Sequence, residues 1–527
     1  RYIPGIFDSV ELVLSASPHI VNLQVVPDLA HQQARVRVWL DSATEGDLVI
    51  EVREAKSGRV AGTASARLSA AAKQTLDLEV PIADCRWWSP EDPFLYQLTA
   101  RTRGDEFETR FGMRTFKFDP ATGRAVLNGK PYLMRGSNIT LYRFFEDPQR
   151  GTLPWNEEWV RTLHRRMKDM HWNCLRYCIG FPPEFWYRIA DEEGILIQDE
   201  FPIWNMERGK AAEYDVNSLA AEYREWMQER WNHPCVVIWD ACNETRSPDI
   251  AKAFAKVRAL DLSNRPWDNG WQPPQDPGDC FESHPYHFID PQFKLSGLAQ
   301  ADPAKAGNVS RDDGKHAVVI NEYGWLWLNR DGTPTTLTKE LYHNLLGAES
   351  TTDERRRLYA RYLAAETEFW RCHRKAAAVM HFTALGYSRP DGQTSDHWTD
   401  VVKLIWEPEF YHYVRDAFAP VGVMIDAWAA EYPAGKRQEF PVVVINDLSG
   451  IWHGEVRFRL LHDGKTVAVK TQPCSVPSLG DAKLSFSIEL PATAGNYQVE
   501  AALVKPGTET PCSLRDFTTL AEDKSKE

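Results

Sequence analysis

The stretch "NHPCVVIWDACNETRSP", residues 232 to 248, carries the pattern from which the fold follows. Five largely apolar residues, Cys235 to Trp239, predict a strand that is covered on both faces, because such a strand shows an uninterrupted apolar run. The chain then turns polar at Asn243 and Glu244, and a helix begins after Ser247, a favoured N-cap residue. Since Ser247 supplies the cap, capping does not explain Asn243 and Glu244.

Strand and helix patterns of this kind alternate through the middle of the chain. Helical stretches such as "EEWVRTLHRRMKDM" and "SLAAEYREWMQERW" separate the strand candidates, and eight strand-then-helix units predict a (β/α)8 barrel. In such barrels the active site forms at the carboxyl ends of the strands, so polar residues there are candidates for function. The strand candidates are "PYLMRGSN" (131–138), "CLRYCI" (174–179), "ILIQDEF" (195–201), "CVVIWDACNE" (235–244), "RPWDNG" (265–270), "CFESHPY" (280–286), "AVVINEYG" (317–324) and "AAVMHFTAL" (377–385).

The regions on either side of this barrel alternate apolar and polar residues with a period of two. Short runs such as "ARVRVWL" before it and "KLSFSIELP" after it are separated by turn-forming residues, which is typical of antiparallel β-sandwiches. We therefore predict a multidomain chain with a β-sandwich at 17–118, the TIM barrel at 119–430 and a second β-sandwich at 431–527.

Composition narrows the classes of partner. The chain of 527 residues has a formal net charge of −13, which argues against nucleic acid because neutralising phosphates needs clustered Lys and Arg. No apolar run approaches the roughly 18 residues that a membrane-spanning helix needs. The 20 Trp, 18 Tyr and 23 Phe residues suit stacking on sugar rings, although burial is the ordinary fate of each. We expect a carbohydrate partner, no nucleic acid and no membrane.

The nine cysteines form no CxxC pair and no Cys/His cluster with zinc spacing. Several stand in apolar strand-like runs, where a free cysteine behaves as a small hydrophobic residue, so no disulfide framework is expected. The bacterial cytoplasm or periplasm suits such a chain better than a secreted, disulfide-rich setting.

A second glutamate ends a strand in "VVINEYG", where Asn321 and Glu322 interrupt the apolar run. Two carboxyl groups that face each other across a barrel mouth are what hydrolysis of a glycosidic bond requires. A solvated loop carboxylate is the alternative for Glu322 alone. In a regular strand Asn243 and Glu244 would point to opposite faces, so the pairing also predicts that the chain leaves β geometry between Cys242 and Thr245.

Other strand-end residues are candidates for substrate binding. Arg176 can hold Glu322 ionised, and a salt bridge to Asp199 or Glu200 is the alternative. Histidine and tyrosine side chains can donate hydrogen bonds to a sugar or to the nucleophile, and tryptophans can stack on sugar rings, with core packing as the alternative. The predicted substrate-binding residues are Asn243, Arg176, Asn138, Asp199, His284, Tyr286, Trp325 and Trp398.

Seven motifs in register resemble glycoside hydrolase family 2, the β-galactosidase, β-glucuronidase and β-mannosidase group. They are "WWSPEDPFLYQLTA", "TRFGMRTFKFD", "LNGKPYLMRGSN", "HWNCLRYC", "ADEEGILIQDEFPIW", "NHPCVVIWDACNE" and "INEYG". The resemblance implies an immunoglobulin-like first sandwich, a catalytic barrel that hydrolyses β-glycosides with retention, and an accessory C-terminal sandwich. It implies Glu244 as acid/base, Asn243 as partner of the sugar 2-hydroxyl and Glu322 as nucleophile, with Arg176 and Asn138 lining the pocket.

The sequence also departs from the family pattern. Residues 1–16 resemble only the last strand of the jelly-roll sugar-binding domain that opens family members, so we expect the rest of that domain to be missing here or to lie on another chain. "DAC" stands where the family more often has "SLG" before Asn-Glu, and we find no Asn-x-Lys element of the β-glucuronidase type. No cofactor is required by the resemblance, while a structural Mg or Na ion and a homo-oligomer are compatible with it.

These observations predict a retaining, exo-acting β-glycosidase that cleaves terminal β-linked sugars, with a β-galactosidase as the first choice. A β-glucuronidase, or another family member that degrades uronic-acid, plant or algal polysaccharides, is the alternative. From another class, a non-catalytic carbohydrate-binding protein is the alternative, and the two glutamates count against it. Partial burial and the nearby charge of Glu322 predict a raised pKa for Glu244.

Overall fold

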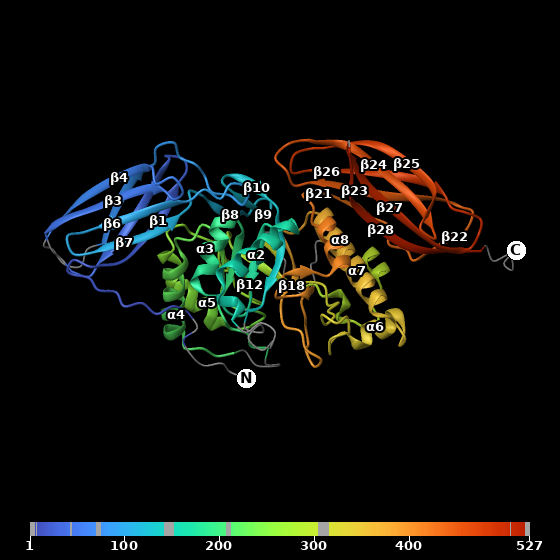
Figure 1. The fold of residues 1–527 in the computed structure, drawn as a ribbon, viewed down its shortest axis with the longest axis horizontal. Coiled ribbons are helices and arrows are strands. Elements are labelled where there is room, and N and C mark those ends of the chain that lie inside the picture. Colours follow the sequence, from blue (N-terminus) through green and yellow to red (C-terminus); the bar gives the residue numbers. More distant parts are fainter. Residues whose placement is uncertain are drawn as a thin grey trace.

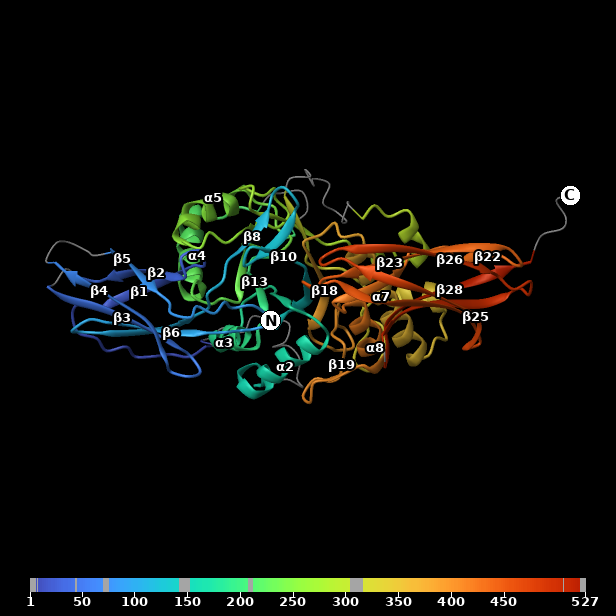
Figure 2. The same ribbon diagram turned by 90° about the horizontal axis from the view of Figure 1, so that it is seen from above.

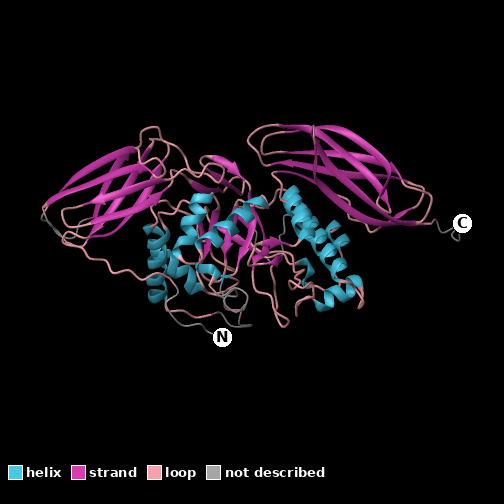
Figure 3. Cartoon of the chain, in the orientation of Figure 1, coloured by secondary structure: helices cyan, strands magenta, loops and turns pink. Residues whose placement is uncertain are grey.

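The computed structural model describes residues 6, 8–42, 45–69, 75–141, 152–206, 212–303, 316–505 and 507–521. Figure 1 shows a central barrel with one β-sandwich at each end of an elongated molecule, and Figure 2 shows the same arrangement from above. The helices, cyan in Figure 3, gather around the barrel, whereas both flanking domains are built from strands. The order of sandwich, barrel and sandwich confirms the predicted fold class.

The first sandwich packs a sheet of order β1-β2-β5 against a sheet of order β4-β3-β6-β7. Alternate residues of β2 point into the core between the sheets, as the period-two pattern predicts. Its strands are β1 (Ile20–Asp28), β2 (Gln33–Leu40), β3 (Gly46–Glu54), β4 (Val60–Leu68), β5 (Thr75–Pro81), β6 (Tyr96–Arg101) and β7 (Glu106–Phe111). A small antiparallel sheet of β8 (Phe116–Asp119), β9 (Arg124–Leu127) and β10 (Lys130–Tyr132) leads into the barrel.

Eight parallel strands form the barrel in the order of the sequence. Seven lie within predicted segments, and the first ends at Ile139, one residue beyond its segment. The eight strands are β11 (Met134–Ile139), β12 (Cys174–Tyr177), β13 (Leu196–Glu200), β14 (Val236–Asp240), β15 (Trp267–Asp268), β16 (Cys280–Ser283), β17 (Ala317–Ile320) and β18 (Ala378–Leu385). The barrel closes because β11 pairs with both β12 and β18. Every residue of β14 is buried, which explains its apolar run.

Helices cover the outside of the barrel (Figure 3). They are α2 (Glu157–Asp169), α3 (Glu184–Glu193), α4 (Val216–Arg230), α5 (Pro248–Val257), α6 (Lys339–Leu346), α7 (Thr352–Cys372) and α8 (Pro408–Ala417). Local signals fix their ends. The Ser247 side chain accepts the backbone N–H of Asp249 as the N-cap of α5, and Gly194, with φ of 72°, ends α3.

The predicted eightfold repeat of strand and helix is incomplete. The connection from β15 to β16 contains no helix, because its segment "WQPPQDPGD" is rich in proline, which cannot continue a helix. Between β16 and β17 the described residues form only the 3-10 helices η3 (His287–Ile289) and η4 (Leu295–Ala299). This side of the barrel is therefore built from loops that can reach over the strand ends.

The C-terminal sandwich has one sheet of order β21-β23-β26 and one of order β22-β28-β27-β24-β25. Its first strand pairs with β23, so this domain begins before the predicted boundary at residue 431. Its strands are β21 (Val421–Ile425), β22 (Glu431–Pro433), β23 (Arg437–Asn446), β24 (Trp452–His462), β25 (Lys465–Val476), β26 (Asp481–Glu489), β27 (Gly495–Lys505) and β28 (Thr508–Leu520). A short hairpin of β19 (Trp398–Asp400) and β20 (Ile405–Trp406) lies between barrel and sandwich in the sequence.

One buried carboxylate joins the C-terminal sandwich to the barrel. Oδ2 of Asp447 lies 2.7 Å from a guanidinium nitrogen of Arg135 and 2.8 Å from one of Arg371, and its Oδ1 lies 2.7 Å from one of Arg374. Burial raises the pKa of Asp447, but the three guanidinium groups lower it more strongly, to about 2. This ion cluster fixes the domain junction.

The described residues before residue 17, which are residues 6 and 8–16, are not in a strand, and Val10, Leu12 and Leu14 are exposed. The backbone N–H of Ala16 donates to the carbonyl of Gly104. A strand needs partners for its backbone groups, and the rest of the expected jelly-roll domain would have to supply them. All nine cysteines are free, as expected. No helix among the described residues is long and apolar enough to cross a membrane.

Candidate active site

The turn after β14 brings Asn243 and Glu244 to the same side of the chain. Asn243 forms an isolated bridge with Trp204, and Glu244 has a φ of 46°, in the left-handed region that a strand residue does not occupy. Both side chains line one cavity. The prediction that the chain leaves β geometry between Cys242 and Thr245 is therefore confirmed, and the unusual φ lies at the residue proposed for chemistry.

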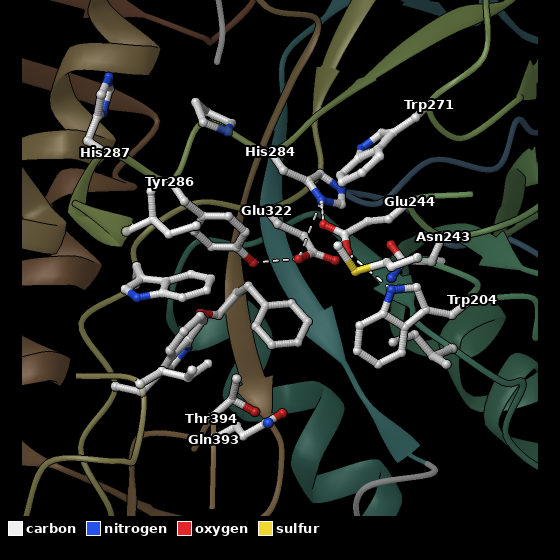
Figure 4. A pocket seen from close by; sticks show the side chains of 18 residues that line it. Trp204, Asn243, Glu244, Trp271, His284, Tyr286, His287, Glu322, Gln393 and Thr394 are labelled. Carbon is white, nitrogen blue, oxygen red and sulfur yellow. Dashed lines mark hydrogen bonds and ion pairs between the residues drawn. The ribbon is translucent and has the colours of Figure 1, made fainter. Parts of the chain in front are cut away.

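The carboxyl ends of the barrel strands surround a cavity of about 300 Å³. Its polar groups include Asn243, Glu244, His284 and Glu322, and its aromatic walls include Trp204, Trp271, Tyr286, Trp325 and Trp327. Figure 4 shows the carboxyl groups of Glu244 and Glu322 turned towards each other, with the ring of His284 beside both. An oxygen of each carboxyl group and a ring nitrogen of His284 all lie within 4.8 Å of one another.

Glu322 receives a hydrogen bond on each carboxylate oxygen. Nη1 of Arg176 lies 2.8 Å from Oε1, and the hydroxyl group of Tyr286 donates to Oε2. Both donors stabilise the ionised carboxylate, and Glu322 itself is only 5% exposed. The arrangement suits a nucleophile that must stay charged before it reacts.

Glu244 is also held at both oxygens. Nδ1 of His284 lies 2.8 Å from Oε1, and Nε1 of Trp204 donates to Oε2 over 3.1 Å. Burial raises the pKa of Glu244, but the bonds from His284 and Trp204 outweigh it, so this pKa lies below its ordinary value. The raised pKa expected from the sequence is therefore wrong for the protein without substrate, because the expectation left out these two donors.

Arg176 lies beneath the cavity floor in contact with several buried carboxylates. It lies 2.7 Å from Glu200, 2.8 Å from Asp240 and 3.4 Å from Glu282 in addition to its contact with Glu322. Both interpretations of Arg176, as partner of the nucleophile and as partner of Glu200, therefore hold at once. Burial raises the pKa of Glu200 and of Glu282 well above the ordinary range, although Arg176 acts against it.

This carboxylate cluster does not fit the structural Mg or Na ion that the sequence left open. Asp240, Asp268 and Glu282 each place an oxygen within 4.8 Å of the others. Oxygens of this cluster already accept hydrogen bonds from Arg176 and from the amide of Gln198.

The structure places four of the predicted substrate-binding residues in the cavity wall: Asn243, His284, Tyr286 and Trp325. Two others lie beneath it. Arg176 and Asn138 are fully buried, and the Asn138 amide donates to the backbone carbonyls of Asn321 and His381, so it ties β11 to its neighbours.

Two predicted substrate-binding residues were wrong. Asp199 accepts hydrogen bonds from Tyr187 on α3 and Trp226 on α4, so it faces the helices outside the barrel. Its neighbour Glu200 faces inward, because successive side chains of a strand point to opposite faces. Trp398 is 1% exposed and stacks on Trp406 at a ring-centroid distance of 3.5 Å, which makes it a core residue.

Residues that the sequence did not single out complete the site. Trp204 lies four residues after the end of β13, and Trp271 lies three after the end of β15, so the strand-end rule applied to each loop would have found both. Glu282 lies within β16 and accepts the backbone N–H of Glu244 at 3.2 Å. No local signal distinguishes it from an ordinary strand residue.

A closed parallel barrel with two hydrogen-bonded glutamates at its mouth defines the barrel domain of a glycoside hydrolase. Two family models make this assignment specific. Residues 18–114 match "Glycosyl hydrolases family 2", and residues 121–268 match "Glycosyl hydrolases family 2, TIM barrel domain". The chain belongs to glycosyl hydrolases family 2.

Individual relatives agree with the family. A protein of Formosa agariphila, named as a candidate beta-glucuronidase, is 31% identical over 219 residues, which are 39% of this chain and 20% of that protein. Beta-galactosidase 2 of Enterobacter cloacae is 28% identical over 264 residues, 46% of this chain and 25% of that protein. The aligned part thus spans a quarter or less of these relatives. The crystal structure of the beta-D-mannosidase of Dictyoglomus thermophilum shares the fold, with a TM-score of 0.66, 16% identity, and coverage of 95% of this chain and 66% of that one.

Proposed function

We propose that this chain carries the catalytic centre of a retaining, exo-acting β-glycosidase that hydrolyses terminal β-linked sugars. The pairing of Glu244 with Glu322 across the cavity carries the proposal. Retaining glycosidases hold their two carboxyl groups about 5 to 5.5 Å apart, and inverting ones about 6.5 to 9.5 Å apart. Oxygens of Glu244 and Glu322 that lie within 4.8 Å of each other support the retaining class.

Each residue has a defined part in the two steps. Glu322 attacks the anomeric carbon while Glu244 gives a proton to the departing glycosidic oxygen, which leaves a glycosyl ester on Glu322. Glu244 then takes a proton from water as that water attacks the same carbon and frees Glu322. Arg176 and Tyr286 orient the nucleophile through their hydrogen bonds until the ester forms.

The cavity supports a single, terminal sugar as the substrate. Its volume of about 300 Å³ lies at the lower end of the range for small-molecule sites. Among the described residues that line it, none is Lys or Arg, which favours a neutral sugar over a uronic acid. We therefore place a β-galactoside first, as the name of the Enterobacter cloacae relative also suggests, and a β-glucuronide second.

A panel of aryl glycosides tests this proposal. The chain is assayed with the 4-nitrophenyl β-D-galactoside, β-D-glucuronide, β-D-mannoside, β-D-glucosaminide and α-L-arabinoside, and proton NMR identifies the anomer that is released first. We expect cleavage of one β-glycoside with release of the β-anomer. Release of the α-anomer would rule out retention.

The Glu322→Gln variant separates catalysis from binding. It keeps the size of the side chain and removes the nucleophile, so turnover should fall by at least about 10⁴-fold with an unchanged circular dichroism spectrum. If the wild-type chain binds sugars but cleaves none of the panel, and Glu322→Gln binds them equally well, the non-catalytic carbohydrate-binding alternative replaces the proposal.

A further inference from the structure

His284 lies between three carboxyl groups. Its Nδ1 is 2.8 Å from Oε1 of Glu244 and 3.7 Å from Oε2 of Glu322, and its Nε2 is 3.3 Å from Oε1 of Glu282. The residue is only 3% exposed, so water does not screen these contacts strongly. Figure 4 shows the ring beside Glu244 and Glu322, on the side away from Trp204.

Charged groups from several strands face this ring. Glu282 comes from its own strand, β16; Glu244 and Asp240 come from β14 and the turn after it; Glu322 follows β17. The guanidinium group of Arg176 on β12 contacts both Glu282 and Glu322. Among these described groups carboxyl groups outnumber guanidinium groups, and those of Glu244 and Glu282 lie beside the two ring nitrogens of His284.

The first chemical step needs a proton on Glu244. The hydrogen bonds from His284 and Trp204 keep the pKa of Glu244 below its ordinary value, so this carboxyl group by itself is ionised at neutral pH. An indole N–H does not give up its proton in this range, and Tyr286 is bonded to Glu322. Of the described groups that are hydrogen-bonded to the Glu244 carboxyl group, His284 is therefore the one that can hold the missing proton.

We propose that His284, held from behind by Glu282, is the positioning residue that stores the acid proton of Glu244. The proposal rests on the proposed glycosidase function. In the free protein the proton is on His284 and Glu244 is charged. As the substrate enters, the Nδ1 proton moves to Glu244, which passes it to the glycosidic oxygen while the bond from that oxygen to the anomeric carbon breaks and the bond to Glu322 forms. In the second step water returns one proton to the pair.

This role differs from the sugar contact expected for His284 from the sequence. Nδ1 is already engaged with Glu244, and Nε2 faces the fully buried strand residue Glu282 instead of the cavity. Glu282 also accepts the backbone N–H of Glu244, so the same carboxyl group orients both members of the pair. The carboxyl group of Glu282 lies on the Nε2 side of the ring, opposite the contact between Nδ1 and Glu244.

The kinetic test uses His284→Gln and Glu282→Gln with two substrates, phenyl β-D-galactoside and 2,4-dinitrophenyl β-D-galactoside, or the same aryl glycosides of the sugar that the panel identifies. A phenolate leaves only with help from an acid, whereas dinitrophenolate leaves without it. We expect His284→Gln to lower kcat/KM for the phenyl glycoside by about 100-fold or more, and for the dinitrophenyl glycoside by less than about 5-fold. The alkaline limb of the pH profile of kcat/KM for the phenyl glycoside should move to lower pH, since Glu244 alone must then retain the proton. Glu282→Gln should shift it in the same direction.

A matched control is His343→Gln, the same change at an exposed histidine on α6. It should leave kcat/KM for both aryl glycosides, and the acid and alkaline limbs of the pH profile, unchanged. An equal loss for both substrates with unmoved pH limbs would mean that His284 is merely structural, and it would overturn the proposal.

A measurement without turnover separates this proposal from the glycosidase function. In protein labelled with ¹³C at histidine Cε1, the signal of His284 is the one that disappears in His284→Gln. Its chemical shift should report an imidazolium at pH 7. In Glu282→Gln the His284 ring should become neutral at a lower pH than in the wild type. A neutral ring at pH 7 in the wild type would overturn the proton storage even if the chain cleaves glycosides. An imidazolium in a chain that cleaves no glycoside would overturn the proposed function alone.

Discussion

Nη1 of Arg176 lies 2.8 Å from Oε1 of Glu322, and both side chains are removed from solvent. The same guanidinium contacts Glu200 and Asp240, so one cation connects the nucleophile candidate to the carboxyl groups inside the barrel. Arg176 therefore supports both the orientation of Glu322 and the stability of the barrel interior.

Replacing Arg176 should affect both properties. Arg176→Met leaves several buried carboxyl groups without their cation, so we expect the free energy of unfolding to fall by about 3 to 5 kcal/mol and kcat/KM to fall by about 100-fold or more. Arg176→Lys keeps the positive charge but not the several N–H donors of the guanidinium group, and it should lose less stability than Arg176→Met. Differential scanning calorimetry and initial rates measure the two effects. A Met variant with the wild-type melting temperature would contradict this account.

Tyr286→Phe isolates one hydrogen bond to the nucleophile. The variant keeps the ring against Trp325 and removes only the hydroxyl group that donates to Glu322. A hydrogen bond to a charged group contributes about 1.5 to 3 kcal/mol, so kcat should fall by about 10- to 100-fold with an unchanged melting temperature. Tyr411→Phe, at an exposed tyrosine on α8, is the control. Equal kcat values in the two variants would remove Tyr286 from the mechanism.

Trp204→Phe should shift the pH dependence of the second step. Trp204 donates to Oε2 of Glu244 and thereby stabilises the ionised form, so its loss should raise the pKa of Glu244. Glu244 must be ionised to accept a proton from water. The acid limb of kcat for the 2,4-dinitrophenyl glycoside should therefore move to higher pH. A limb that stays in place or moves to lower pH would contradict the hydrogen bond.

Asp447 should make the domain junction sensitive to acid. Its pKa in the folded protein is about 2, below the ordinary 3.8, so its stabilisation is complete above about pH 4 and is lost as the pH falls through 2. That stabilisation amounts to about 2 kcal/mol. Asp447→Asn should lower the free energy of unfolding at pH 7, and the difference from the wild type should shrink towards pH 2. Asp463→Asn, at a largely exposed side chain, should show no such trend.

Trp398→Phe tests a residue that the sequence placed in the binding site. Because Trp398 is buried against Trp406 and donates to the carbonyl of Ala384, the change should lower stability by about 1 to 3 kcal/mol and leave KM within about 2-fold. Thermal unfolding and steady-state kinetics decide the point. A several-fold rise in KM at unchanged stability would restore the stacking role.

Much of this fold could be predicted from local patterns. The apolar run of β14 and the similar runs of β17 and β18 predict buried parallel strands, and the alternation in β2 predicts a sandwich strand, because these patterns depend only on which faces are covered. The incomplete helical repeat could have been inferred from the prolines after Trp271. The lack of strand structure in residues 6 and 8–16 could not, because strand pairing depends on a neighbouring strand.

The sequence by itself determined the barrel, the two flanking sandwiches and the position of Glu244 and Glu322 at strand ends, since strand periodicity and turn chemistry are local. Only the tertiary structure decided that Glu200 faces the site while Asp199 faces the helices, because a strand buried on both faces shows no alternation from which the inward face can be recognised. It also decided the pKa of Glu244, which follows from His284, 40 residues away in the chain and 2.8 Å away in space. Protonation states depend on distance between charges, and that distance exists only once the chain has folded.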